Sequence, residues 1–515
     1  MQRQVFSKPV LIATVIASLI LQACFPIQHN QEAVLGTTGF ANKPEQAASP
    51  NRAIEFRSQT ELATKAALPV DDLPRLTVTT LPEVEIRADG NSPRHRDRPS
   101  LSGTPQVVST THFRVHYTTT GTHQVPEADT NQNGIPDYVE EVAKALEYVW
   151  EIEINYFGWP VPPADNGLGG DDRYDVYLED ILGDNYAGYT EGAYDDSIIG
   201  DNPNTPNVIE ERSSFSYIAL DNDYQELEPS DGIKPLELMR ITAAHEFLHA
   251  IQYGIDGLET LDWLWEATAT WIEDEVFDGI DDGEYWLPTV FKSPDSCLVA
   301  EGGTDRVEDD GHWYGMWIFA RFLSENYGHS IVQDLWYSAV NADGHQVIED
   351  TLVNRNLVPK KVFEDFLIAL LTRDFEEGAT YPTVRLEGQA QLENTFSPID
   401  GVDKLGADYL EVLGDGQLTI ALLAEQLEGI VVGIANQQSA IFPMTEGSVS
   451  LDADEFEHLY LIVINHNQVS YEYNCQVVDY QVEVSASSQV QPAREVLPAP
   501  NFRRPRVEGL QNPSN

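Results

Sequence analysis

The fold is decided by residues 241–254, which read ITAAHEFLHAIQYG. Apolar side chains recur there at the spacing of an α-helix and form one stripe, made of Ile241, Ala244, Leu248 and Ile251. His245 and His249 are four residues apart, so their imidazoles project from one face of the predicted helix, close enough to bind a single ion. The segment therefore predicts a helix that carries two ligands of a metal site.

Glu246 follows the first histidine and lies on the same side of the predicted helix. In a His-Glu-x-x-His site the ion activates a water molecule and polarises a carbonyl group, and the glutamate accepts the proton of that water. The alternative is a partly exposed helix with two coincidental histidines, because the motif also occurs in unrelated proteins.

Residues 263–273, WLWEATATWIE, predict a second helix whose small residues allow close approach to the first. Glu266 on this helix can supply a third ligand. Two histidines and one carboxylate leave a coordination position open for water, as catalytic zinc requires, whereas structural zinc sites are usually closed by cysteines. We therefore expect a catalytic zinc ion bound by His245, His249 and Glu266, with Glu246 as the catalytic base.

Two further side chains are candidates for supporting roles. Glu273 lies seven residues after Glu266 on nearly the same helical face, so it could orient a ligand histidine, replace Glu266 as the ligand, or be a surface carboxylate. Tyr314, in the segment HWYG, could stabilise a tetrahedral oxyanion. A core tyrosine at the start of an aromatic-rich helix is the alternative for Tyr314.

At these motifs the chain resembles the gluzincin group of metallopeptidases, in which a glutamate from a following helix joins His-Glu-x-x-His. The shared segments are HEFLH and WLWEATATW. The metzincin pattern requires glycine and histidine where Gln252 and Ile255 stand. A wider set of segments is similar to a family of bacterial secreted metalloproteases over residues 108–376, namely FRVHYTTTG, DTNQNGIPDYVEEV, DDRYDVYLED, HEFLHAIQY and WLWEATATWIEDEV. This resemblance implies a zincin-like catalytic domain that hydrolyses peptide bonds.

Residues 129–140, DTNQNGIPDYVE, place oxygen donors at the spacing of an EF-hand calcium loop. Gly134 permits the sharp turn at the sixth position. The expected calcium ligands are Asp129, Asn131, Asn133, the carbonyl of Ile135, Asp137 and Glu140. A polar Asn-Gly turn without metal is the alternative.

The charge of the chain restricts its partners. Eighty-four acidic and 30 basic side chains give a formal net charge of −54, which opposes binding to nucleic acid or anionic lipid. We expect no nucleic-acid partner. The same acidity favours solubility and divalent cations.

The first 23 residues predict an export signal, with Arg3 and Lys8 before an apolar stretch at 9–21 that is too short to span a bilayer. Residues 21–24, LQAC, resemble the bacterial lipobox, which implies cleavage before Cys24 and its lipidation. An ordinary signal peptide with a chance cysteine is the alternative. The expected location is extracytoplasmic, at the cell surface or in the periplasm, tethered to a membrane by lipid.

Composition divides the rest of an α+β chain into four parts. We expect a tether or propeptide at 24–107, the catalytic domain at 108–383, a β-sandwich at 384–486 and a disordered tail at 487–515. Cys297 and Cys475 could form one disulfide or remain as buried thiols.

Three functions are compatible with these features. The leading hypothesis is zinc-dependent hydrolysis of peptide bonds in extracytoplasmic proteins or peptides. A surface binding or adhesion lipoprotein with a vestigial catalytic domain is the second, and intact Glu246 argues against it. Zinc-dependent hydrolysis of a non-peptide bond is the third, because metal ligands alone do not identify the bond attacked.

Overall fold

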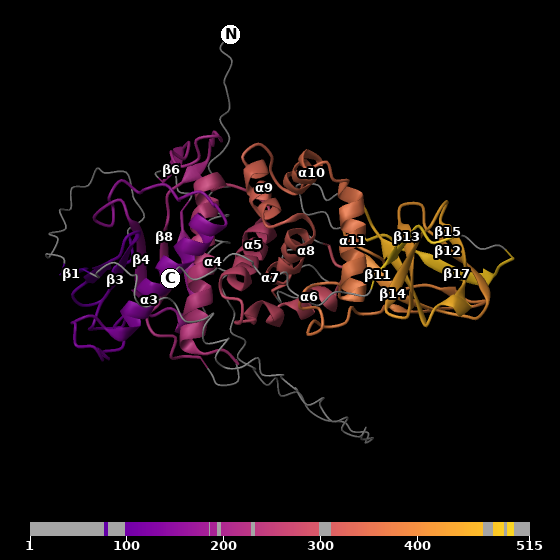
Figure 1. The fold of residues 1–515 in the computed structure, drawn as a ribbon, viewed down its shortest axis with the longest axis horizontal. Coiled ribbons are helices and arrows are strands. Elements are labelled where there is room, and N and C mark those ends of the chain that lie inside the picture. Colours follow the sequence, from indigo (N-terminus) through magenta and orange to yellow (C-terminus); the bar gives the residue numbers. More distant parts are fainter. Residues whose placement is uncertain are drawn as a thin grey trace, which may run out of the picture.

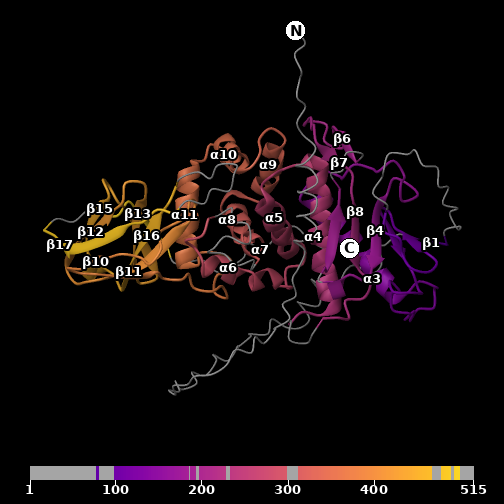
Figure 2. The same cartoon turned by 180° about the vertical axis from the view of Figure 1, so that it is seen from behind.

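A computed structural model describes the chain over residues 77–80, 98–184, 186–192, 197–227, 232–297, 311–466, 477–488 and 492–498. These residues form a mixed α+β protein with a sheet at each end and helices between them (Figure 1). The view from behind shows the same order of parts (Figure 2). The expected signal peptide, Cys24 and Cys475 lie outside the described residues.

The N-terminal sheet has six strands in the order β1-β2-β3-β4-β8-β5. Its central pairs, β3 with β4 and β4 with β8, are parallel, and the remaining pairs are antiparallel. In that order the strands are Thr77–Thr80, Gln106–Ser109, Phe113–Tyr117, Tyr174–Glu179, Tyr217–Asp221 and Gly188–Glu191. A separate antiparallel pair is formed by β6 (Ile198–Gly200) and β7 (Ser213–Ser214).

The folded region begins earlier than the boundary at residue 108 that composition suggests. Strand β1 comes from the segment 24–107, strand β2 crosses the end of that segment, and the two continue the sheet outward from β3. Val107 is fully buried, and Arg98 pairs with Asp165, which is also buried. A strand as short as β2 shows too little alternation to be recognised from its sequence.

The helices fill the middle of the molecule. Helix α3 (Asp137–Trp150) continues into a π-helical turn, η1 (Glu151–Tyr156), and packs against the long helix α4 (Pro235–Asp256). The remaining helices are α5 (Asp262–Val276), α6 (Leu287–Phe291), α7 (His312–Gly315), α8 (Trp317–Tyr327), α9 (Ser330–Ala339), α10 (His345–Asn354) and α11 (Pro359–Thr372). Short 3-10 turns are η2 (Leu182–Asp184), η3 (Asp282–Tyr285) and η4 (Ala453–Glu455).

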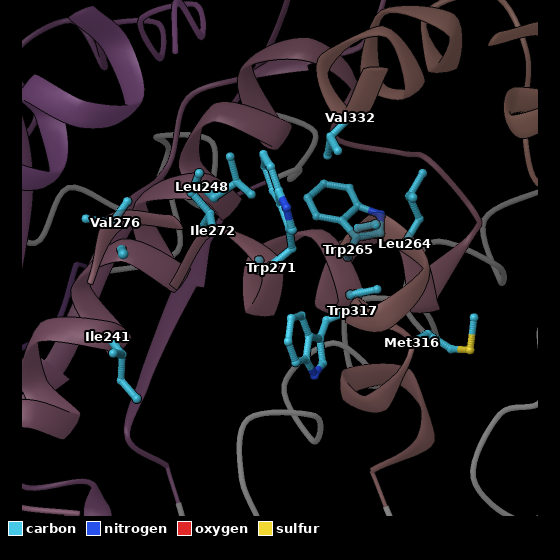
Figure 3. Packing of buried hydrophobic residues seen from close by; sticks show 14 of the residues in the cluster. Ile241, Leu248, Leu264, Trp265, Trp271, Ile272, Val276, Met316, Trp317 and Val332 are labelled. Atoms are coloured by element: carbon cyan, nitrogen blue, oxygen red, sulfur yellow. The ribbon is translucent and has the colours of Figure 1, made fainter. Parts of the chain in front are cut away.

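Helix α5 lies at the centre of the helical layer, and nearly all of its residues are buried. Trp265 and Trp271 belong to the same core cluster as Leu248 of α4 (Figure 3). The Trp265 ring meets the ring of Trp336 from α9 edge-on at 4.8 Å, and the Trp271 indole N–H donates to Ser324 of α8 at 3.1 Å. Aromatic burial of this kind fixes α5 against three neighbouring helices.

The C-terminal β region (residues 388–497) contains two sheets that share a second apolar core. The six-stranded sheet is ordered β18-β14-β13-β16-β11-β9, with bounds Glu495–Leu497, Gln438–Pro443, Glu428–Ala435, His458–Ile464, Ala407–Leu413 and Gly388–Gln391. The four-stranded sheet is ordered β10-β17-β12-β15, with bounds Thr395–Phe396, Gln481–Ala486, Gln417–Leu423 and Ser448–Asp452. Strand β18 pairs with β14 inside the segment expected to be a disordered tail, so pairing extends past residue 487.

The C-terminal β region is joined to the helices through one continuous core. Phe366 and Leu367 of α11 lie in the same apolar cluster as Tyr409 and Ile462 of the six-stranded sheet. The fully buried Tyr409 hydroxyl donates to the backbone carbonyl of Leu367 at 2.9 Å. Burial of so much shared apolar surface indicates that the two parts are stabilised together.

We expect Tyr409→Phe to lower the free energy of unfolding by about 1 kcal/mol, because the Leu367 carbonyl loses a buried donor while the ring remains. Urea denaturation measures this change. The matched control is Tyr460→Phe, at a half-buried tyrosine of the same sheet, which should leave the unfolding midpoint nearly unchanged. Equal midpoints for both variants would show that the hydrogen bond between Tyr409 and Leu367 contributes nothing to the free energy of unfolding.

Candidate metal centre

Helix α4 presents both motif histidines to the interior. It begins at Pro235, where the Glu237 carboxylate accepts from the backbone N–H of Lys234 at 3.1 Å, and it continues without interruption to Asp256. His245 and His249 are 2% and 6% exposed, and their Nε2 atoms are 3.0 Å apart. The helical spacing predicted from the sequence therefore brings the two imidazoles to a common point.

Helix α5 brings the carboxylate of Glu266 to the same point. Its Oε2 atom is 3.2 Å from His245 Nε2 and 3.7 Å from His249 Nε2. Zinc bound by nitrogen and oxygen at about 2.0–2.1 Å holds neighbouring tetrahedral ligands at about 3.4 Å from one another. The three donors thus fit a zinc ion with small adjustments, and they form one of the groups among the described residues that could hold a metal.

Each histidine is held in orientation through its other ring nitrogen. Glu273 Oε1 is 2.6 Å from His245 Nδ1, and Gln252 Oε1 is 2.6 Å from His249 Nδ1. The Gln252 amide in turn donates to Thr268 Oγ1 of α5 at 2.9 Å. Such contacts fix the tautomer and angle of a ligand imidazole. Glu273, which is 5% exposed, therefore contacts the outer side of His245, away from Glu266.

Sequence reasoning did not assign Gln252 to this site. It lies three residues after His249, one helical turn further on, and it is completely buried. A fully polar side chain at that spacing in an otherwise apolar helix is the signal that could have identified it.

Glu246 contacts the N-terminal sheet and is 1% exposed. The Thr190 hydroxyl, on strand β5, donates to Glu246 Oε2 at 2.8 Å and is also 2.8 Å from the Glu246 backbone carbonyl. Burial raises the pKa of the Glu246 carboxyl, and positive charge on His249 and His245 partly offsets the rise. A carboxylate with a raised pKa accepts a proton more readily near neutral pH.

Competition between burial and pairing sets the pKa values of the acidic and imidazole groups in this site. Burial alone would raise the pKa of Glu266, but hydrogen bonds from His245 and His249 outweigh it and hold the pKa at about 2. For His245, Glu266 and Glu273 outweigh burial and raise the pKa well above its usual value. Burial raises the pKa of Glu273 to about 7, against the opposing effect of His245.

Tyr314 lies beside the metal-ligand group. Its ring is 6.2 Å from the ring of His245 with 27° between the planes, and it stacks on Trp286 at 4.9 Å. The side chain is 4% exposed. The neighbouring His312 is buried as well, and burial lowers its pKa to about 4. The structure therefore brings the predicted oxyanion residue within reach of the site.

A further buried acid, Glu153, was not found from the sequence. It lies in the π-helical turn η1, is 0% exposed, and neither carboxyl oxygen has a hydrogen-bond partner in the described part of the chain. Burial raises its pKa well above the usual value, while the nearby charge on His245 acts in the opposite direction. π-helical turns are frequent at functional sites.

The loop at 129–140 has the hydrogen bonds expected of an EF-hand-like turn. Asp129 accepts from the backbone N–H groups of Asn133 and Gly134 at 3.1 and 2.9 Å. The side-chain amides of Asn131 and Asn133 both donate to Glu140, at 3.0 and 2.6 Å. The side chains of Asn131, Asn133 and Glu140 therefore meet, and Asp129 caps the turn beside them.

The other two expected ligands are placed differently. The Asp137 carboxylate accepts from the backbone N–H and the hydroxyl of Thr130, at 2.9 and 2.5 Å, and these hydrogen bonds lower its pKa. The Ile135 backbone N–H donates to Asn133 Oδ1 at 2.9 Å, which turns the chain toward α3. Asp137 thus stabilises the turn.

The described residues include no helix that is both apolar and long enough to cross a bilayer. Cys297 is disulfide-bonded. Cys475, its possible partner in the sequence analysis, lies outside the described residues.

Comparisons with known proteins identify no relative: no protein-family model matches this chain, and no curated protein matches it significantly.

We expect Glu273→Gln to weaken zinc binding by about 10–100-fold, because the amide still reaches His245 Nδ1 but removes the charge behind the ligand. Competition against a chromogenic chelator measures the affinity. Glu266→Gln is the comparison variant and should lose more affinity, since it removes a direct ligand. Equal losses for the two variants would contradict the distinction between ligand and supporting carboxylate.

We expect calcium to raise the melting temperature of the wild-type protein, and Glu140→Gln to abolish the part of that rise due to the loop at 129–140. The variant removes one charge yet keeps an acceptor for Asn131 and Asn133. Thermal unfolding with and without calcium measures the effect. An identical calcium response in wild type and variant would assign the loop to a turn without metal.

Proposed function

We propose that this chain is a zinc-dependent hydrolase of peptide bonds in extracytoplasmic proteins or peptides. The observation that carries the proposal is the convergence of His245, His249 and Glu266 from two packed helices, with donor atoms 3.0, 3.2 and 3.7 Å apart. All three side chains are buried, and none of the donors is a thiolate. A donor set of this type leaves a coordination position open, which is characteristic of catalytic zinc.

Glu246 supplies the general base in this proposal. Zinc bound by the three donors would lower the pKa of a water molecule and polarise the scissile carbonyl. Glu246 would accept the proton of that water, a role that its burial and raised pKa favour. Thr190 donates to Oε2 of Glu246 and so limits rotation of this carboxylate. The orientation of the other oxygen, Oε1, is thereby restricted as well.

The N-terminal sheet offers a way to hold an extended peptide beside this base. Strand β5 is at the edge of the sheet, and Thr190 on this strand contacts Glu246. A peptide that pairs with an edge strand gains main-chain hydrogen bonds whatever its sequence. A substrate bound to β5 in this way would pass the catalytic carboxylate.

Tyr314 is the proposed donor to the oxyanion that forms when the carbonyl is attacked. Its ring stacks on Trp286 and faces His245, so its position is determined by packing. Oxyanion stabilisation requires such a preorganised donor.

The remaining assignments follow from the same hypothesis. The N-terminal sheet and the helices would form a zincin-like catalytic domain, and the two sheets of the C-terminal β region a β-sandwich. Lipid on Cys24 would tether the protein to a bacterial membrane, and calcium in the loop at 129–140 would brace α3.

One observation favours the alternative of a binding lipoprotein. A hollow of about 570 Å³ in the C-terminal β region is lined by polar and aromatic residues, among them Asn436, Gln438, Phe442, Asp452 and Phe456. Pockets that mix apolar walls with a few polar groups are typical of ligand sites. The same hollow is compatible with an enzyme whose β region binds substrate.

We expect Glu246→Gln to lower kcat/KM for peptide cleavage by about 10²–10⁴-fold while zinc content stays at the wild-type level, because it removes the base and no ligand. A peptide-library digest with metal analysis of the same samples measures both quantities. Glu411→Gln, an equivalent change on strand β11, is the matched control and should retain activity. Zinc-loaded wild type that cleaves no library peptide would contradict the proposal and favour the binding lipoprotein.

A further inference from the structure

The turn between α4 and α5 joins the two helices that carry the proposed zinc ligands. Asp256 is the last residue of α4, Glu259 lies in the turn, and Asp343 lies in the loop between α9 and α10. One carboxylate oxygen from each lies within 4.8 Å of the others. Asp256 and Glu259 are 1% and 4% exposed, whereas Asp343 is at the surface. The group thus reaches from the interior of the protein to solvent.

Glu259 presents a buried oxygen that the protein does not satisfy. Its Oε1 atom accepts three backbone N–H bonds, each of 2.8 Å, from Thr260, Leu261 and Gly344. Its Oε2 atom is buried and has no hydrogen-bond partner among the residues that the structure describes. A buried carboxylate oxygen without a donor costs free energy unless a cation neutralises it.

Arg212 provides one positive charge to this group. It pairs with Asp256 and lies 2.8 Å from Asp343, while its backbone carbonyl accepts from the N–H of Gly257. When all three carboxylates are ionised, the single guanidinium leaves two negative charges on the group. Burial raises the pKa of Asp256 to about 6 and that of Glu259 to about 7. Such a rise is expected when nearby positive charge does not fully offset the cost of burying a carboxylate.

The chemistry of the three donor groups indicates which class of metal ion they would bind. All three are carboxylate oxygens, which hard cations such as calcium prefer, whereas zinc and copper sites draw on histidine or cysteine. Calcium binds oxygen at about 2.3–2.6 Å, so ligands on opposite sides of the ion are about 4.6–5.2 Å apart. Oxygens that all lie within 4.8 Å of one another can therefore share a calcium ion, with water at the exposed side.

We propose that Asp256, Glu259 and Asp343 form a calcium site that ties the α4–α5 turn to the α9–α10 loop. It is separate from the loop at 129–140, and it does not depend on the hydrolase activity. Calcium there neutralises the two excess charges and anchors the turn from which Glu266 is positioned. The ion has a structural role, because its ligands do not contact the proposed catalytic group.

Terbium, which takes the place of calcium and luminesces when an excited indole lies close by, can test this site in the full chain freed of metal. The Trp265 indole N–H donates to the Glu259 carbonyl at 3.2 Å, so terbium bound here lies near an indole. We expect tryptophan-sensitised emission that calcium displaces, that Glu140→Gln retains, and that Glu259→Gln loses. Unchanged emission in Glu259→Gln would overturn the proposal.

Calcium itself is tested by thermal unfolding in the Glu140→Gln background, where the other predicted calcium loop is disabled. Glu259→Gln keeps the oxygen that accepts the three backbone N–H groups, so without calcium it should unfold at the same temperature as its parent or higher. With calcium, only the parent should gain stability. Asp343→Asn, a change at an exposed position, should lose the same gain without a folding defect. A gain that persists in both variants, or is missing in the parent, would refute a calcium site here.

Because the measurements use zinc-free protein, their failure would leave the proposed hydrolase untouched. Conversely, loss of peptide cleavage in Glu246→Gln says nothing about calcium at Asp256, Glu259 and Asp343.

Discussion

The packing of α5 against α4 is the contact on which the rest of the centre depends. It buries Glu266 next to His245 and His249, where an unpaired carboxylate would be strongly unfavourable. Small residues, including Ala244 and Ala267, are completely buried and let the two helices approach closely. The indoles of Trp265 and Trp271 then hold α5 from its other sides (Figure 3). The donor geometry is thus a consequence of helix packing.

That packing concentrates acidic groups in the interior of a chain whose net charge is already −54. Burial raises the pKa of Glu246, Glu273 and Glu153 around the centre, and of Asp256 and Glu259 at the α4–α5 turn. Buried carboxylates can be stabilised by protonation, by basic partners or by metal ions. Only 30 basic side chains are present against 84 acidic ones, so basic partners are few. Binding of divalent cations is therefore consistent with the need to neutralise these buried carboxylates.

Much of the secondary structure was accessible from the sequence because the helices have strong apolar periods. The helix predicted at 241–254 lies within α4, and the helix predicted at 263–273 lies within α5. Strand β2 was not recognised because its four residues show too little alternation. Strand β18 in the expected tail was not recognised because it is stabilised by pairing with the distant strand β14. Helix α10 was missed as well, since its sequence HQVIEDTLVN contains few apolar residues.

The sequence by itself determined which residues can act: the spacing of His245, Glu246 and His249 on one helical face is a local property of the chain. Only the tertiary structure decided that Glu266 meets both imidazoles and that Glu273 and Gln252 contact their outer nitrogens. Contacts between separate helices depend on packing angle and side-chain volume, which no local pattern specifies. For the same reason no local pattern predicts that Asp343 of the α9–α10 loop lies beside Asp256 and Glu259 of the α4–α5 turn.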